Sequence, residues 1–231
     1  MEAIILAGGR AERLGGAAGG LPKPLVEVAG RPLVAWQVAM LARAGVERVI
    51  VSCAKGDGAS FEQALAGLGP EIAIAEEAER LGRGGGIRFA AESRQEAAPF
   101  YALNGDELLD LDFGAMLDRH RGTGAAAVVA VARPQSPFGV VDLADDDRVT
   151  GFSEAGAVPY WVSCGVYVLD DEAVERFPER GDHETTAFPE LAAERRLYAF
   201  RYEGLWLTVN TPKELRRADE YVMAHREWLP A

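Results

Sequence analysis

The chain has 231 residues, of which 48% are hydrophobic and 26% charged, a composition typical of a folded globular protein that excludes wholesale disorder. Its formal net charge of −12 excludes a nucleic acid or an anionic membrane surface as the main partner, because both would repel it. Any phosphate that binds must therefore meet a locally positive site.

Neither cysteines nor histidines suggest a metal or disulfide framework. Cys53 and Cys164 lie far apart and outside any Cys-x-x-Cys or Cys/His spacing, which fits a reducing compartment. The three histidines have no metal-ligand spacing and are expected on the surface. The apolar run at the amino terminus is too short for a signal peptide, and no stretch reaches the roughly 18 apolar residues of a membrane span. We therefore expect a cytoplasmic protein with no membrane partner.

In the first half of the chain, predicted strands alternate with predicted helices. Apolar runs predict strands over residues 3–7, 46–53, 72–75 and 100–103. Helices are predicted over residues 32–44, 61–68, 87–96 and 113–119, the first with Pro32 in its first helical position and Gly45 after its end. A Gly- and Ala-rich segment over residues 8–20 predicts a long loop. This alternation is typical of βαβ units in a parallel sheet.

The second half contains several strands that are separated by short connections. Strands are predicted over residues 126–132, 140–143, 148–152, 162–169 and 197–202, and helices over residues 170–177, 186–194 and 212–226. Only turns separate the middle strands, which indicates a mixed or antiparallel extension of the sheet. No repeat or linker divides the chain. We expect one domain over residues 1–231, a Rossmann-like three-layer α/β/α sandwich with a mixed, mainly parallel central sheet.

The loop after the first strand has the chemistry of a phosphate site. Gly8 and Gly9 directly after a strand allow backbone amides to approach phosphate oxygens, and Arg13 and Lys23 add the positive charge that the composition lacks. The loop lacks the Gly-Lys-Ser/Thr of a Walker loop and the glycine spacing of a dinucleotide fingerprint. From the glycines alone, a surface loop with solvated arginines is an equal alternative.

Two further segments follow predicted strands. Asn104-Gly105-Asp106 ends a strand, where open α/β sheets bind ligands, and its carboxylate is a suitable ligand for Mg²⁺. Residues 76–87, which contain Glu77 and the run Gly82-Arg83-Gly84-Gly85-Gly86, connect a strand to a helix. Taken alone, the first segment also fits a simple turn and the second a turn that caps the next helix.

Together these segments resemble the sugar-phosphate nucleotidylyltransferases, whose opening pattern is LAGGxGTRL followed by PKP. Here the pattern stands as Leu6-Ala7-Gly8-Gly9-Arg10-Ala11-Glu12-Arg13-Leu14 and Pro22-Lys23-Pro24. The resemblance implies that Leu6, Ala7, Gly8 and Gly9 wrap a nucleoside triphosphate. It also implies that Arg13, Lys23 and Asp106 are catalytic, with Mg²⁺ on Asp106. Glu77, Gly82, Arg83 and Gly84 would contact the nucleotide base, with Arg83 where the family usually has threonine.

The resemblance continues through the second half of the chain. Gly139, Glu154 and Gly165 match positions beside the sugar in the family, so residues 1–120 would bind nucleotide and residues 121–231 sugar. The implied reaction joins a nucleoside triphosphate to a sugar 1-phosphate and releases pyrophosphate. The stretches at residues 138–139 and 160–161 look most like enzymes that use mannose or glucose 1-phosphate.

Two departures from the family pattern affect the site. Ala155 stands where the family has a phosphate-binding lysine, and Thr208 where it has a second metal-binding aspartate. Asp112, Glu203 and Arg83 are candidates to replace the lost charges. Two alternatives therefore stay open: a catalytically weak or silent nucleotide-binding regulator, and a cytidylyltransferase for a non-sugar phosphate. The sequence leaves the base, the sugar and the oligomeric state open, a homo-oligomer included.

Overall fold

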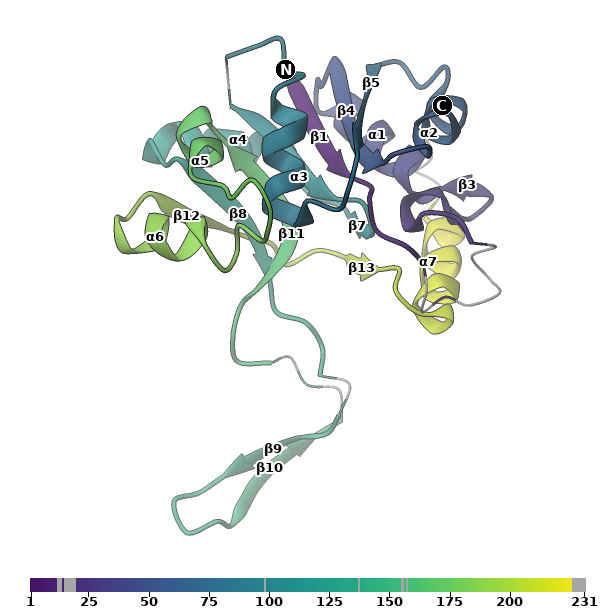
Figure 1. The fold of residues 1–231 in the computed structure, drawn as a ribbon. Helices are drawn as coiled ribbons and strands as arrows, with labels where there is room; N and C mark the ends of the chain where they lie inside the picture. The colour runs from purple at the N-terminus through teal and green to yellow at the C-terminus, as the bar shows by residue number, and fades with distance from the viewer. Residues whose placement is uncertain are drawn as a thin grey trace.

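The computed structural model describes residues 1–11, 14, 20–97, 99–136, 138–154, 156 and 158–225. Its centre is a seven-stranded sheet in the order β12-β8-β11-β6-β1-β4-β5 (Figure 1). The strands are β1 (Glu2–Leu6), β4 (Arg48–Ala54), β5 (Glu71–Glu77), β6 (Phe100–Asn104), β8 (Ala127–Ala132), β11 (Val162–Leu169) and β12 (Leu197–Arg201).

The sheet is mixed and mainly parallel, as the sequence predicts. Strand β1 runs parallel to both β4 and β6, β4 runs parallel to β5, and β8 runs parallel to β12. Only β11 is antiparallel to its neighbours, β6 and β8. The parallel strands β6, β1, β4 and β5 therefore end at one common edge, which is where an open α/β sheet binds ligands.

Helices cover both faces of the sheet and complete the three-layer sandwich (Figure 1). They are α1 (Leu33–Arg43), α2 (Gly58–Leu65), α3 (Gly82–Ala91), α4 (Phe113–Thr123), α5 (Asp171–Glu175), α6 (Ala187–Ala193) and α7 (Pro212–Ala224). Strand β1 alternates between the layers, with Ala3 and Ile5 in the core that includes Trp36 of α1, and Ile4 in the core that includes Ile87 of α3. This alternation places α1, α2, α4 and α7 in one layer and α3, α5 and α6 in the other. Among the described residues, no helix has the length and apolar character needed to cross a bilayer.

Short elements that the sequence analysis does not predict gather near the carboxyl edge. Strand β7 (Glu107–Leu109) pairs antiparallel with β13 (Trp206–Thr208), which joins segments almost a hundred residues apart. A 3₁₀ turn at Lys23–Leu25 and the two-residue strands β2 (Glu27–Val28) and β3 (Arg31–Pro32) lead into α1. Runs of two or three residues carry too little periodicity to be recognised, since their partners are distant in sequence.

Strands β9 (Val140–Leu143) and β10 (Val149–Ser153) form an antiparallel hairpin outside the main sheet. We call residues 138–154 the arm, because the hairpin projects far from the body in Figure 1. Several of its apolar side chains are exposed, among them Phe138, Leu143 and Phe152. The expectation that these strands extend the sheet is therefore wrong: alternation predicts a strand, but it does not say which strand will be its neighbour.

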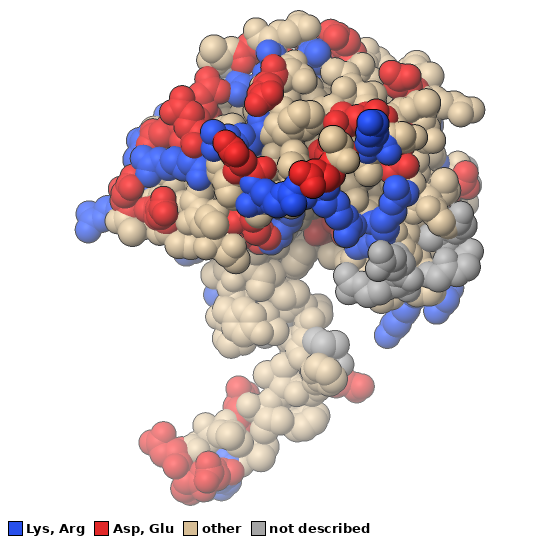
Figure 2. All heavy atoms as spheres, viewed as in Figure 1, with Lys and Arg blue, Asp and Glu red and all other residues tan. Residues whose placement is uncertain are grey.

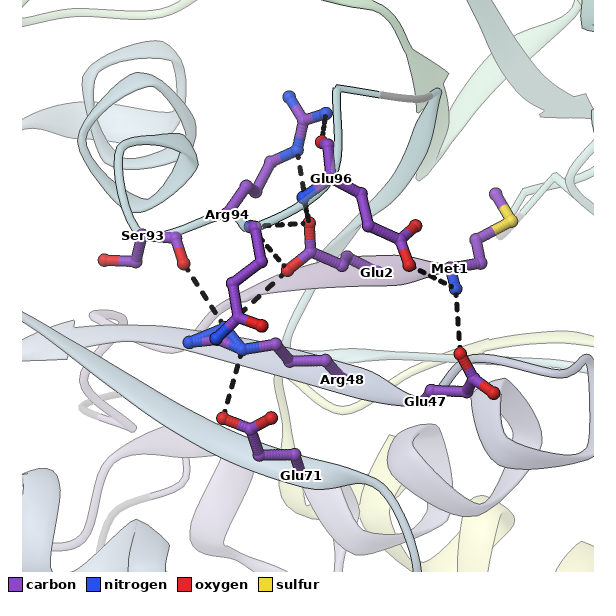
Figure 3. A network of polar contacts seen from close by, with 9 residues as sticks. Met1, Glu2, Glu47, Arg48, Glu71, Ser93, Arg94 and Glu96 are labelled. Carbon is purple, nitrogen blue, oxygen red and sulfur yellow. Dashed lines mark hydrogen bonds and ion pairs between the residues drawn. The ribbon is translucent and has the colours of Figure 1, made fainter.

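A buried ion network stabilises the opposite, amino-terminal edge of the sheet (Figure 3). Glu2 is 3% exposed, and its carboxylate accepts the backbone amides of Gln95 and Glu96. Arg48 and Arg94 lie 3.6 and 3.9 Å from the same carboxylate. Because this edge is closed by polar partners, the open edge for ligands lies at the other end of the parallel strands.

Two further sequence expectations are corrected. Helix α3 begins at Gly82 rather than residue 87, because its glycines permit a close approach: a Cβ on Gly85 would lie 2.4 Å from the carbonyl oxygen of Glu179. His120 and His183 are 5% and 0% exposed rather than on the surface. Both pack inside the helical layers, a location that local sequence pattern does not indicate.

Candidate active site

The carboxyl edge of the sheet holds a cavity of about 490 Å³. It is lined by the ends of strands β1, β5 and β6 and by the segments that follow them. The lining residues are Leu6, Gly8, Gly9, Lys23, Pro24, Glu77, Arg80, Gly82, Arg83, Asn104, Gly105, Asp106 and Glu107. Three motifs that the sequence analysis treats separately, at residues 6–9, 77–83 and 104–106, therefore surround one cavity.

The two ends of the glycine-rich loop lie side by side at the site. The amide of Lys23 donates to the carbonyl of Gly9 at 3.0 Å, and Arg10 forms a β-bridge with Pro22. Leu6, Gly8 and Gly9 line the cavity, whereas Ala7 is fully buried behind it and donates its amide to the carbonyl of Ser52. Arg13, the other basic residue predicted for this loop, lies outside the described residues.

Lys23 lies at the centre of the charged part of the cavity. Its ammonium is 2.9 Å from Oδ2 of Asp106 and also donates to Oδ1 of Asn210. The two charged side chains are 12% and 26% exposed, so the pair is screened less than a surface ion pair. Lys23 reaches the site because the 3₁₀ turn that follows Pro22 places it opposite the end of β6.

Gly105 makes this arrangement possible. Its amide donates to the carbonyl of Leu6 at 2.9 Å, and a Cβ at this position would lie 2.5 Å from the same oxygen. The turn that carries Asp106 therefore packs directly on the end of β1. Only a residue without a side chain permits this contact.

Glu107 is a site residue that the sequence analysis misses. Its side chain is 8% exposed, lines the cavity and accepts a hydrogen bond at Oε2 from Nε1 of Trp206, at 2.6 Å. Burial raises the pKa of Glu107 to about 8, helped by the carboxylate of Asp106 and opposed by Trp206 and Lys23. The position could be found only from the pairing of β7 with β13, because in sequence it is one more acid after a turn.

The loop between β5 and α3 forms the opposite wall. Glu77 is 8% exposed; its Oε1 accepts from the hydroxyl of Ser52, and its Oε2 accepts from the amide of Leu81. Gly82 also lines the cavity, with a positive φ of 79° that favours glycine. Gly84 is not part of the lining: it is buried, and its amide donates to the carbonyl of Gly181. Its predicted contact with the base is therefore replaced by packing against the segment after α5.

Arg83 lines the cavity, and ion pairs with two acidic residues hold its guanidinium in place. It makes ion pairs with Asp182 and with Oε2 of Glu184, the latter at 2.7 Å, and Glu184 in turn accepts the hydroxyl of Tyr167 at 2.8 Å. The pKa of Arg83 is raised: burial opposes the charged form, but the bond to Asp182 and the two carboxylates outweigh it. Both bonds use Nε and Nη2, so Nη1 makes no hydrogen bond with the described residues.

Of the three residues predicted for sugar binding, one lies beside the cavity and two lie on the arm. Gly165 lies in a bulge of β11 with φ of 68°, and a Cβ there would be 2.3 Å from Nδ2 of Asn104, which lines the cavity. Gly139 and Glu154 are exposed on the arm and do not line the cavity. A second cavity of about 590 Å³ lies beyond Thr208, with Trp161 in its lining. Gly165 therefore lies beside the cavity, and the two arm residues lie apart from it.

The candidates for a replacement second carboxylate lie elsewhere. Asp112 caps α4 by accepting the amide of Ala115 and lines a different cavity. Glu203 is exposed in the lining of the second cavity. Neither lines the cavity that contains Asp106.

The oxygen donors around Asp106 fit a hard divalent cation. A carboxylate, a second carboxylate at Glu107 and the amide oxygen of Asn210 are the ligand types that Mg²⁺ accepts, with phosphates and water completing the shell. Within the described ranges, no group of three or more His, Cys, Asp or Glu side chains is positioned as a metal site. A cation here would therefore depend on the substrate for part of its coordination.

Comparison with known proteins agrees with this geometry. The sequence model of the nucleotidyl transferase family matches residues 2–224. A mannose-1-phosphate guanylyltransferase catalytic subunit beta of Danio rerio is 32% identical over 229 residues, which cover 93% of this chain and 62% of the relative. Mannose-1-phosphate guanyltransferase beta-A of Xenopus laevis is 30% identical, with 100% of this chain and 68% of the relative covered.

The chain thus spans less than two thirds of the length of several curated relatives that it matches, 62% in the Danio rerio case. The structure of HddC from Yersinia pseudotuberculosis complexed with GMP-PN has a TM-score of 0.73 at 22% identity, over 95% of this chain and 98% of that one. At this identity the likeness supports the fold alone. The family match over nearly the whole chain and the relatives at 30% identity or more show that the chain belongs to the nucleotidyl transferase family.

Proposed function

We propose that the chain transfers a nucleoside monophosphate from a nucleoside triphosphate to a sugar 1-phosphate. The observation that carries this proposal is the pairing of Lys23 with Asp106 at 2.9 Å, beside Gly8 and Gly9 at the carboxyl edge. This pairing supports the proposal because a cation and a carboxylate beside glycine amides at the end of a strand are suited to binding the phosphates of a nucleotide.

In the proposed reaction, a phosphate oxygen of the sugar 1-phosphate attacks the α-phosphorus. A new P–O bond forms, the bond from that phosphorus to the bridging oxygen breaks, and pyrophosphate leaves with the electron pair. Such transfer depends on positioning and charge neutralisation rather than on a covalent intermediate. Lys23 would orient the phosphates, and the backbone at Gly8 and Gly9 would leave room for them. Mg²⁺, held by Asp106, would neutralise charge on the phosphate oxygens when bound.

We further propose a guanine nucleotide and a hexose 1-phosphate as the first substrates to test. The relatives from Danio rerio and Xenopus laevis are named as mannose-1-phosphate guanylyl- or guanyltransferases. Arg83 offers a second argument, because its Nη1 makes no hydrogen bond with the described residues, and guanine presents two acceptors, O6 and N7, on one edge. A cytoplasmic location remains a prediction.

The test is pyrophosphate release across a panel of nucleoside triphosphates and sugar 1-phosphates. Lys23→Ala is expected to lower kcat/KM by roughly 10- to 100-fold, the worth of one charge-assisted contact. Lys213→Ala is the matched control, since Lys213 is exposed on α7 and does not line the cavity.

A second measurement separates the enzyme from a regulator that only binds nucleotide. That alternative is motivated by Ala155 and Thr208, which carry no charge where the family resemblance implies a lysine and an aspartate. A triphosphate present at 100 times its dissociation constant should stabilise the fold by about 2.7 kcal/mol. If thermal unfolding shows this stabilisation but no pair of substrates releases pyrophosphate, the regulator replaces the enzyme.

A further inference from the structure

Glu107 and Thr208 lie directly opposite each other on two paired strands. They are register partners in the antiparallel pair of β7 with β13. Side chains at directly opposed positions of such a pair point to the same face, with Cβ atoms about 5 Å apart. A carboxylate on β7 can therefore occupy nearly the same space as one placed at position 208 on β13.

Of the two carboxylate oxygens of Glu107, one accepts a hydrogen bond from the described residues and the other accepts none. Trp206 donates its indole N–H to Oε2, which fixes the orientation of the group. The other oxygen, Oε1, takes no hydrogen bond from the residues that the structure describes, although the side chain is 8% exposed and lines the cavity. Oε1 is not among the buried atoms that lack a partner, so it is open to the cavity, where a ligand can reach it.

The positive charge in the cavity does not satisfy this group. The ammonium of Lys23 is engaged by Asp106 and Asn210. Asn104, which also lines the cavity, has a buried Oδ1 without a donor among the described residues. An acceptor oxygen without a donor, in the same cavity as Asp106 and Glu107, is a feature that a bound cation would satisfy.

The remaining carboxylate of the cavity is arranged differently. Glu77 has the same 8% exposure, but each of its oxygens accepts a hydrogen bond, from Ser52 and from Leu81. Of the described carboxylates that line this cavity, those of Asp106 and Glu107 belong to residues that are neighbours in the sequence.

We propose that Glu107 is the second carboxylate of a divalent-cation site that it forms with Asp106, supplied by β7 where Thr208 leaves β13 without one. The assignment deepens the proposed transfer reaction and rests on it for the phosphates that would complete the coordination. The cation would be hard and oxygen-loving, with Mg²⁺ or Mn²⁺ as the matching class.

The test is the affinity of the whole chain for Mn²⁺ alone, measured from the free Mn²⁺ signal in electron paramagnetic resonance. Glu107→Gln keeps an oxygen that can accept from Trp206, so the variant removes the charge with little change of shape. We expect Glu107→Gln and Asp106→Asn each to weaken Mn²⁺ binding by about tenfold or more. Glu203→Gln is the control, because Glu203 is an exposed acid in the lining of the second cavity, and it should change the affinity by less than about twofold.

A charge-transfer experiment across the strand pair makes the test sharper. Thr208→Asp added to Glu107→Gln should restore most of the lost Mn²⁺ affinity, because the two positions face the same space. A purely structural role for Glu107 would give no such recovery. Equal Mn²⁺ affinity in wild type and folded Glu107→Gln, or no Mn²⁺ binding by the wild type, would overturn the assignment.

A measurement on the wild type alone covers the case in which Glu107→Gln does not fold. Fe²⁺ bound at a metal site cleaves the nearby backbone when ascorbate and peroxide are added. We expect cuts in both β7 and β13. If cuts are absent from either strand, the proposal is overturned. The outcome is separable from the proposed function. If Mn²⁺ binds through Glu107 but no pyrophosphate is released, the proposed function fails and the metal site stands. If pyrophosphate is released and Glu107→Gln binds Mn²⁺ as tightly as the wild type, the metal site fails and the proposed function stands.

Discussion

His183 is a fully buried imidazole in the layer that packs against α3, the helix that carries Arg83. It stacks on Phe177 with 4.8 Å between ring centroids and meets the rings of Tyr167 and Phe188 edge to face. Neither ring nitrogen has a hydrogen-bond partner among the described residues. Burial lowers the pKa of His183 to about 4, against the opposing effect of the Asp182 and Glu184 carboxylates.

The pH dependence of stability follows from this shift. Between about pH 6.5, the unfolded value, and about pH 4, the unfolded chain binds a proton that the native His183 does not. The contribution of His183 is therefore complete above pH 6.5 and is lost as the pH falls towards 4. We expect His183→Phe to flatten this part of the stability curve, by up to about 3 kcal/mol, in urea unfolding from pH 8 to pH 4.5.

The comparison uses slopes, so a constant packing difference between imidazole and phenyl drops out. At pH 8 both rings are uncharged, and the offset between the two proteins there measures packing alone. An unchanged slope in the variant would show that other groups account for acid sensitivity.

Gly165 tests how strand β11 supports the cavity. Its φ of 68° disfavours any side chain, and a Cβ would also run into Asn104. Gly124 is a matched control, because it has a similar φ of 60° but no atom within 4 Å of a built Cβ. Gly124→Ala should lose about 1 kcal/mol of unfolding free energy from the backbone alone, and Gly165→Ala should lose about 1–3 kcal/mol more.

The same pair separates stability from site geometry. Displacement of Asn104 should weaken triphosphate binding in Gly165→Ala, whereas Gly124→Ala should keep wild-type affinity, since Gly124 ends α4 far along the chain from the lining residues. Equal losses of stability and affinity in both variants would contradict the contact with Asn104. Isothermal titration with a non-hydrolysable triphosphate provides the affinities.

At the scale of elements, the arm is the part of the molecule that packs least. Among the described residues, two backbone hydrogen bonds hold its base, from the amide of Ser136 to the carbonyl of Gly156 and from the amide of Val158 to the carbonyl of Pro134. Phe138 and Phe152 are 77% and 71% exposed, and neither belongs to the core clusters. Such a hairpin adds little to the stability of the body, because buried apolar area is what stabilises a fold.

Replacement of residues 141–152 by two glycines is therefore expected to change the unfolding free energy of the body by less than about 1 kcal/mol. The ends can be joined, since Val140 and Ser153 are paired. Triphosphate affinity should stay unchanged, because the residues around Lys23 are retained. The variant retains Gly139 and Glu154, so the KM for the sugar phosphate should rise only if the hairpin holds these two residues in position. A large loss of body stability on denaturant unfolding would show that the arm packs on the body in solution.

At the scale of the whole molecule, acidic and basic side chains are spread unevenly over the surface. Acidic and basic side chains are mixed over the visible face of the body, while the end of the arm is mainly acidic (Figure 2). The acidic end corresponds to the run Asp145-Asp146-Asp147. Against a net charge of −12, Lys23, Arg80 and Arg83 all line one cavity. The same lining also includes Glu77, Asp106 and Glu107, so acidic and basic side chains are balanced at the carboxyl edge of the sheet although the chain as a whole is acidic.

The strand and helix pattern could be predicted from sequence because it depends on local periodicity. The apolar run at residues 3–7 and its glycines place a buried strand and a loop, and parallel strands then end at a common edge. The chemistry of the glycine-rich loop and of the strand end, together with the family resemblance, selects Lys23 and Asp106, and the fold brings them within 2.9 Å of each other. Glycines and a proline mark these turns by backbone conformation, which is a property of the residue itself.

The tertiary structure alone decided the features that depend on pairing between distant segments. The site role of Glu107 depends on the pairing of β7 with β13, and the helix start at Gly82 depends on contact with residues 178–183. The arm lies outside the sheet although its strands alternate correctly, and His183 is buried although its neighbours in sequence are polar. Local pattern determines which conformation a segment favours, but burial and register are set by which partner it meets, and that partner is far away in the chain.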